Sequence, residues 1–112
     1  MPTRCIKVRL QPGCEAEVAA WAAELNRRSD EVLATLAAEG VTLEAAFLDH
    51  QADGVSLIYV MHAADFGHAV AVAKASAAPI DTYHRDFKQR CWDERTVLEP
   101  LIDFVNAAAA QD

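Results

Sequence analysis

The residues whose types and spacing best suit chemistry lie between Pro79 and Trp92. Proline favours the first turn of a helix, so this segment predicts a helix that runs from Ile80 to Trp92. His84 then follows Asp81 by one turn, a spacing at which a carboxylate can orient an imidazole ring. Histidine has an ordinary pKa of about 6.5, so His84 with Asp81 is a candidate general base or proton shuttle.

The same helix also permits a purely structural interpretation. Its apolar stripe falls at spacings of three and four residues, and consists of Ile80, Tyr83, His84, Phe87 and Cys91. A sheet would bury such a stripe, with His84 packed and hydrogen-bonded within it. Asp81 would then only favour the helix N-terminus.

Four further side chains are candidates for binding a ligand. Three are aromatic residues that carry a hydroxyl or an indole N–H, namely Tyr59, Tyr83 and Trp92, and the fourth is Lys88, which carries an ammonium group. A tyrosine on such a strand more often fills the core and sends its hydroxyl to the rim. The two tyrosines are therefore hydrogen-bond donors to a ligand only if a pocket lies between sheet and helix.

The sequence predicts no metal site and no cofactor. Its four histidines are scattered and fall into no HxH or HExxH spacing, with His62 and Asp65 as the one weak alternative. No glycine-rich phosphate loop is present. Cys5, Cys14 and Cys91 form no CxxC pair, which favours a reducing cytoplasm.

Composition and charge restrict the class of protein and of partner. The 112 residues predict one domain over 1–106, with a frayed tail over 107–112. A net charge of -7 and a pI near 4.9 argue against nucleic acid or an anionic membrane as partner. No apolar run has the length of a membrane span or the form of a signal peptide, so we expect a soluble cytoplasmic protein.

Periodicity predicts alternating strands and helices along the chain. The first half of the chain is expected to form a strand over 4–10 and a helical segment up to Gly40, which restarts near a capping Ser29. Strands over 41–48 and 55–61 follow, joined by an Asp-Gly turn. The remaining elements are a helix capped by Asp65, the helix after Pro79, and a strand over 96–105 in which Pro100 indicates an edge position or a bulge. This order is the βαββαβ pattern of ferredoxin-like folds, an α+β class with helices on one face of a four-stranded antiparallel sheet.

The strand over 55–61 is apolar on both of its alternating faces. Such a strand is covered on both sides, whereas the helices of a chain this short cover only one face of the sheet. The second face must be covered by a ligand, a partner chain or both. We therefore expect a two-fold homodimer.

This arrangement resembles the dimeric α/β-barrel superfamily, in which two such sheets pack their bare faces together. That superfamily includes cofactor-free monooxygenases, muconolactone isomerases, haem-degrading enzymes and stress-responsive proteins, whose catalytic patterns are not visible here. Several stretches more closely resemble a family of small bacterial proteins of unknown function, namely those at 21–28, 30–36 and 79–84, extended by Phe87-Lys88 and Cys91-Trp92. The resemblance implies the fold and brings no activity with it.

Two hypotheses of function follow. The first is a dimeric binding or interaction module that holds a small apolar ligand. The alternative is a cofactor-free isomerase or monooxygenase-like enzyme, with His84 and Asp81 as an acid–base pair and Tyr59 or Tyr83 as hydrogen-bond donor. We prefer the first, because the sequence demands burial more clearly than it demands chemistry. Whether the protein is an enzyme stays open at this stage.

Overall fold

The structure is a computed structural model that describes residues 2–106, so the predicted tail over 107–112 lies outside it. Eight elements follow one another in the order β-α-α-β-β-α-α-β. They are β1 (Thr3–Leu10), α1 (Glu15–Arg27), α2 (Ser29–Glu39), β2 (Val41–Gln51), β3 (Gly54–Ala63), α3 (Phe66–Ala75), α4 (Pro79–Cys91) and β4 (Trp92–Val97).

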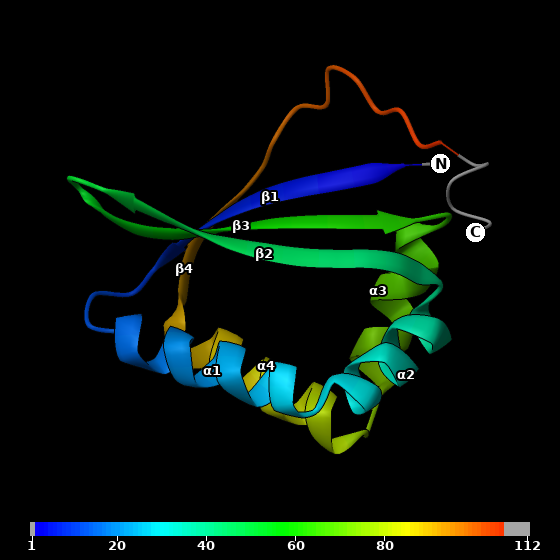
Figure 1. The fold of residues 1–112 in the computed structure, drawn as a ribbon, viewed down its shortest axis with the longest axis horizontal. Helices are drawn as coiled ribbons and strands as arrows, with labels where there is room; N and C mark the ends of the chain where they lie inside the picture. The colour runs from blue at the N-terminus through cyan, green and yellow to red at the C-terminus, as the bar shows by residue number, and fades with distance from the viewer. Residues whose placement is uncertain (1, 107–112) are drawn as a thin grey trace.

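The four strands form one antiparallel sheet in the order β2-β3-β1-β4, which confirms the predicted four-stranded antiparallel sheet and places β1 and β3 at its centre. All four helices lie on the same side of this sheet (Figure 1). Ile6 lies opposite Tyr59 and Val8 opposite Leu57, so these four side chains share the face that the helices cover.

The main core lies where α1 and α4 cover this face. Val8 and Phe87 are completely buried there, and the rings of Trp21 and Phe87 stack with centroids 4.7 Å apart. A second cluster, formed by Leu36, Val41, Ala63 and Ala69, lies under α2 and α3. The core is thus divided into two parts along the sheet.

Helix boundaries follow local signals. Gly40 ends α2 in the left-handed conformation at a φ of 73°, and the Asp65 side chain accepts a hydrogen bond from His68 N at 3.0 Å, as predicted for a capping residue. The predicted restart near Ser29 is confirmed, but the capping role is wrong. Ser29 is the first residue of α2 and makes no cap hydrogen bond, because Arg28 occupies the junction and bonds Glu31 at 2.7 Å.

The predicted last strand is present at an edge of the sheet, but its predicted bounds, 96–105, are wrong. β4 begins immediately after α4, at Trp92, and leaves the sheet after Val97. Pro100 cannot donate to a ladder, and the segment 98–106 instead runs past β1 on the side away from the helices (Figure 1). Leu98 N donates to Cys5 O at 2.9 Å, and Thr3 N donates to Asp103 Oδ2 at 2.7 Å.

Within residues 2–106, no helix is both long and apolar enough to cross a membrane.

Candidate functional site

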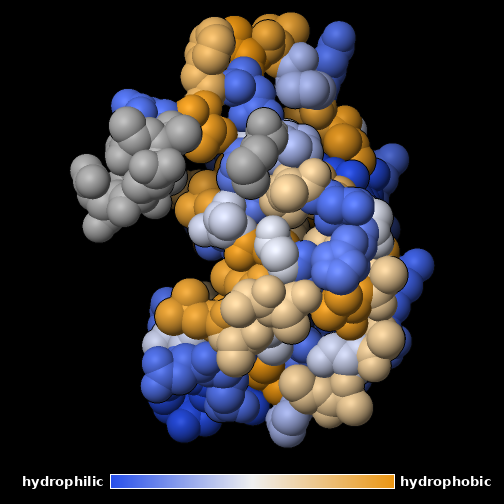
Figure 2. Space-filling view, turned by 90° about the vertical axis from the view of Figure 1, so that its right-hand side faces the viewer, coloured by the Kyte–Doolittle hydropathy of each residue, from blue (hydrophilic) through white to orange (hydrophobic). Residues whose placement is uncertain are grey.

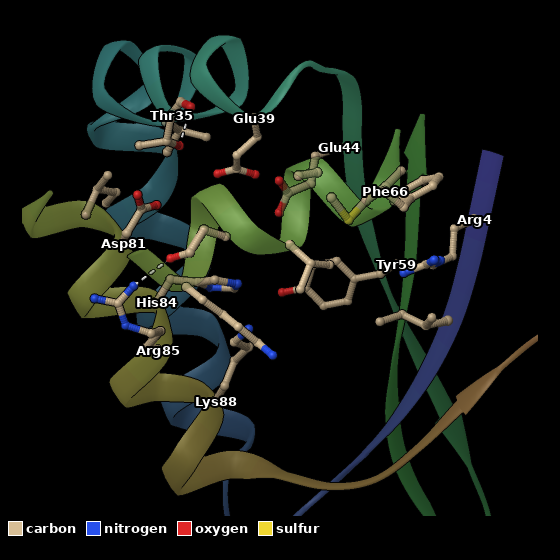
Figure 3. A pocket seen from close by; sticks show the side chains of 18 of the residues that line it. Arg4, Thr35, Glu39, Glu44, Tyr59, Phe66, Asp81, His84, Arg85 and Lys88 are labelled. Atoms are coloured by element: carbon tan, nitrogen blue, oxygen red, sulfur yellow. Dashed lines mark hydrogen bonds between the residues drawn. The ribbon is translucent and has the colours of Figure 1, made fainter. Parts of the chain in front are cut away.

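A cavity of about 300 Å³ lies between the helical layer and the sheet, where the two core clusters meet. Seen from the end of the molecule that carries α2 and α3, the surface is hollowed between the two layers, with apolar residues along the hollow (Figure 2). Apolar side chains make up much of the wall, and they include Ile6, Leu25, Val32, Met61, Phe66 and Ala69. Five polar side chains point into the same central space, namely Glu39, Glu44, Tyr59, His84 and Lys88 (Figure 3).

His84 is held by a tryptophan rather than by a carboxylate. Trp21 Nε1 donates to His84 Nδ1 at 3.0 Å, and the two rings stack with centroids 5.7 Å apart. An imidazole nitrogen that accepts a hydrogen bond carries no proton, so the proton of neutral His84 lies on Nε2. Burial, with the positive charges of Lys88 and Arg85, lowers the pKa of His84 to about 4, so the ring is neutral near pH 7.

Tyr59 comes from the centre of β3 and is 3% exposed. Its hydroxyl is buried without a hydrogen-bond partner among the residues that the structure describes. Burial, and secondly the charge of Glu44, raises the pKa of this hydroxyl, so it remains a donor. A buried hydroxyl without a partner costs about 1–3 kcal/mol, which a ligand with an acceptor oxygen would recover.

Glu44 faces the cavity because the edge strand β2 carries an irregularity. The register between β2 and β3 shifts between Val41 and Leu43, and Thr42 Oγ1 donates to His62 O at 3.1 Å at that point. The shift turns Glu44 to the helical face, opposite Met61 and diagonal to Tyr59. Burial raises the pKa of Glu44, and the positive charge of Lys88 partly offsets this effect.

Glu39 completes the acidic side of the cavity from the last turn of α2, where it is 8% exposed. Burial, followed by the negative charges of Asp81 and Glu44, raises its pKa from 4.5 to about 7. Neither Glu39 nor Glu44 has a hydrogen bond or salt bridge to its carboxylate within residues 2–106. Two carboxyl groups of raised pKa therefore share one cavity.

Lys88 lies on the opposite wall, on α4. Its ammonium is 5.1 Å from the centroid of the Trp92 ring, and burial lowers its pKa. Trp92 also lines the cavity, and its indole N–H is buried without a partner in the described part of the chain. Lys88 and Trp92 are both predicted ligand-binding residues, and both reach the cavity.

The predicted pairing of His84 with Asp81 is not formed. Asp81 lines the cavity, but its carboxylate accepts a hydrogen bond from Ser76 Oγ, in the bend between α3 and α4. Arg85 also serves this bend, since it donates to Ala73 O at 2.9 Å and Ser76 O at 2.8 Å (Figure 3). Asp81 therefore stabilises the start of α4. The His84 ring is oriented by Trp21 and not, as the helical spacing had suggested, by Asp81.

Tyr83, the remaining predicted ligand-binding residue, is not among the residues that line the cavity. It is half-buried and packs against the main core cluster. Tyr83 precedes His84 by one residue on α4, which separates the two side chains by about 100° around the helix axis and leaves Tyr83 outside the cavity wall.

The cysteines form a separate feature at the far end of α1. A disulfide joins Cys14, just before α1, to Cys91, the last residue of α4. Glu17 Oε2 lies 3.2 Å from Cys91 Sγ, so these three residues gather ligand-type atoms within 4.8 Å of one another. Because Cys14 Sγ and Cys91 Sγ are joined in the disulfide, neither is a thiolate that could bind a metal in the oxidised protein. Cys5 is free and half-buried.

Sequence reasoning missed both glutamates and the role of Trp21. Neither Glu39, at the end of α2, nor Glu44, on the edge strand β2, is among the residues predicted for a site. The sequence pattern points the other way for Glu44, because the apolar residues Leu43 and Phe47 would be expected on the core face, whereas they are 48% and 59% exposed on the face opposite to Glu44. Their parity along the strand would fit the core only without the shift near Thr42.

Comparison with known proteins supports the fold and a family. The solved structure of Rv0793 from Mycobacterium tuberculosis matches with a TM-score of 0.51 at 16% sequence identity, over 90% of this chain and 95% of that chain. At this identity the likeness concerns the fold alone. None of the curated proteins matches the chain. The model of DUF6176, a family of unknown function, matches residues 1–109, and the chain therefore belongs to that family.

Proposed function

We propose that the protein binds a small, mainly apolar molecule in the cavity between its sheet and its helices. The observation that carries this proposal is the buried Tyr59 hydroxyl, which faces the cavity without a partner. The cavity volume of about 300 Å³ is at the lower end of the range for ligand pockets, so the ligand is a small metabolite.

The polar groups of the cavity determine which chemical group of the ligand they can bind. Tyr59 and His84 each present one hydrogen-bond donor, and Lys88 adds a partly buried ammonium group. An acceptor oxygen such as a carbonyl fits these donors. The rest of the ligand lies against the apolar wall.

A matched pair of ligands tests this proposal. Cyclohexanone and methylenecyclohexane have nearly the same shape, but only the ketone has an acceptor oxygen. We expect both to bind, with the ketone roughly tenfold tighter, which is the worth of one hydrogen bond. Ligand-observed NMR and thermal shift measure this, since a ligand of the folded state raises its apparent stability.

Variants locate the binding in the cavity. Tyr59→Phe should remove the preference for the ketone and keep the affinity for the hydrocarbon. Ala73→Leu enlarges a half-buried side chain of the cavity wall and should lower the affinity for both ligands. Ala71→Leu, on the exposed side of the same helix, is the control. Equal binding by the Ala73 and Ala71 variants would contradict the proposal.

We further propose the ferredoxin-like fold of the dimeric α/β-barrel type, with a two-fold homodimer. The strand order β2-β3-β1-β4 supports this fold. The sheet face away from the helices supports the dimer, because Leu43 and Phe47 lie exposed there beside half-buried Ile58 and Val60. Sedimentation at micromolar concentration that finds only a 12.2 kDa species would contradict it.

A cytoplasmic location is proposed together with this function. In a reducing cytoplasm the Cys14–Cys91 pair would be held as two thiols rather than as a disulfide. Thiol labelling of protein in freshly lysed cells tests the location, since three reactive thiols are expected there after unfolding, whereas a disulfide would leave one.

A second candidate function, a cofactor-free isomerase or monooxygenase-like enzyme, is favoured by one observation. Glu39 and Glu44 carry carboxyl groups of raised pKa in the same cavity as the donors Tyr59 and His84. The acid–base pair of His84 with Asp81 is not the form that this chemistry would take, because Asp81 bonds Ser76.

A further inference from the structure

The binding proposal uses the donors of the cavity and leaves its two carboxyl groups without a role. Glu39 and Glu44 lie across the central space from His84 and Lys88, and all four point into it (Figure 3). Glu44 lies diagonal to Tyr59 on the same face of the sheet, within reach of a molecule that contacts its hydroxyl. A ligand whose oxygen meets the donors would therefore present its neighbouring carbons to Glu44.

We propose that the cavity catalyses proton transfer at the carbon next to a carbonyl group, with Glu44 as the base and with Tyr59 and His84 as donors to the carbonyl oxygen. This inference rests on the proposed binding function and names its substrate class, small ketones. It requires no cofactor and no co-reactant.

Each step balances with the residues present. The Glu44 carboxylate takes the proton from the carbon next to the carbonyl, and the electron pair of that C–H bond forms a carbon–carbon double bond. The carbonyl pair moves to oxygen, where the hydrogen bonds from Tyr59 and His84 Nε2 strengthen as negative charge develops. Protonated Glu44 then returns the proton to the same carbon, or to the far carbon of a neighbouring double bond, and the carbonyl re-forms.

The tautomer of His84 is what makes it a donor here. Trp21 holds Nδ1, so the Nε2 proton is the one left for the ligand. A neutral imidazole can donate to a developing enolate without first losing a proton. Trp21 is thus a positioning residue, which acts through His84.

The two carboxyl groups differ in environment, and this separates their roles. Burial raises the pKa of Glu39 to about 7, and the negative charges of Asp81 and Glu44 add to this effect. Burial also raises the pKa of Glu44, but the positive charge of Lys88 is the second largest influence there and favours the carboxylate. Glu44 takes the role of the base because it lies diagonal to Tyr59 on the same face of the sheet. Glu39 lines the same cavity from the end of α2 and has no part in the proton transfer.

Hydrogen exchange of cyclohexanone in deuterium oxide, followed by NMR, tests the inference. The protein should speed exchange at the two carbons beside the carbonyl, and Glu44→Gln should lower that rate at least ~100-fold. Tyr59→Phe should lower it roughly 100-fold through loss of one donor. Glu94→Gln, an exposed carboxylate outside the cavity, is the control and should leave it unchanged.

The affinity for a phenolate provides a second measurement, in which Glu44→Gln should cause a gain instead of a loss. A phenolate oxygen resembles the enolate, and the Glu44 carboxylate repels it. Glu44→Gln should therefore tighten the binding of a nitrophenolate by roughly tenfold or more while it abolishes exchange. A purely structural role for Glu44 would weaken both. Glu44→Asp keeps the charge and should lower exchange without tightening the nitrophenolate.

The outcomes separate the two proposals. Binding of cyclohexanone without accelerated exchange would overturn the proton-transfer inference and leave the binding function. Exchange that survives Glu44→Gln at the wild-type rate would overturn the role of Glu44 and with it the inference. Absence of binding by both cyclohexanone and nitrophenolate would overturn both proposals.

Discussion

Trp21 Nε1 donates a hydrogen bond to His84 Nδ1 at 3.0 Å, and this contact ties α1 to α4 at the wall of the cavity. It has two consequences. It fixes the tautomer of His84, and it satisfies an indole N–H that is buried in the main core. The same pair of residues therefore contributes both to the packing of the core and to the geometry of the site.

Trp21→Phe tests this relationship directly. The variant keeps most of the aromatic surface but leaves His84 Nδ1 without its donor, so we expect a loss of roughly 2–3 kcal/mol in the free energy of unfolding. Nitrogen NMR should show His84 as a mixture of tautomers. Trp92→Phe is the control, since its indole N–H has no partner within residues 2–106 and the same truncation should cost less. Equal losses in the two variants would mean that the hydrogen bond contributes little.

Glu39 makes stability depend on pH in a predictable direction. Its pKa is raised from 4.5 to about 7, so the folded state holds this proton more tightly than the unfolded state. The resulting stabilisation is complete below pH 4.5 and is lost as pH rises through about 7. The charged groups that act on Glu39 are Asp81, Glu44 and Lys88. The pH dependence of wild type should therefore be compared with that of a variant that changes Glu39 and keeps these three residues.

Glu39→Gln is that variant. Urea unfolding between pH 4.5 and 8 should show a flatter pH dependence than wild type, with a gain of roughly 1–2 kcal/mol at pH 8 after allowance for water in the cavity. Glu15→Gln, in the exposed first turn of α1, controls for the loss of one negative charge. Parallel curves for Glu39→Gln and wild type would show that Glu39 titrates normally.

Phe47→Glu tests the proposed dimer. Phe47 is 59% exposed on the sheet face away from the helices, so the proposed contact would bury a charge introduced at this position without a compensating partner. Sedimentation should then shift from dimer to monomer without loss of secondary structure. Leu33→Glu, at a residue 62% exposed on α2, is the matched control on the helical layer and should leave the dimer intact. A dimer that tolerates Phe47→Glu must use another surface.

The Cys14–Cys91 disulfide should contribute strongly to stability once formed. It closes a loop with a sequence separation of 77 residues, for which the loss of unfolded-state entropy corresponds to roughly 4 kcal/mol. A dithiol reductant should lower the free energy of unfolding of the purified, oxidised protein by an amount of that order. Cys91→Ser should abolish this response, whereas Cys5→Ser, at the free cysteine, should preserve it.

The sequence by itself determined the elements whose signals are local. Local signals predicted seven of the eight elements. They are the alternation over 4–10, the continuous apolar run over 55–61, the Asp-Gly turn, the cap at Asp65, Gly40 at the end of α2 and Pro79 at the start of α4. These signals depend on the residues themselves and on their immediate neighbours. The apolar alternation after Thr96 misled for the same reason, since nothing local shows that β4 has already paired with β1 from Trp92 onward.

Only the tertiary structure decided the site. Helical spacing suggested Asp81 as the partner of His84, but Ser76 and Trp21 come from other elements and reach these two side chains first. Glu44 enters the cavity because of a register shift between two strands, and a shift of one residue exchanges the two faces of a strand. Contacts between distant elements depend on how the layers pack, and periodicity along one segment does not contain that information.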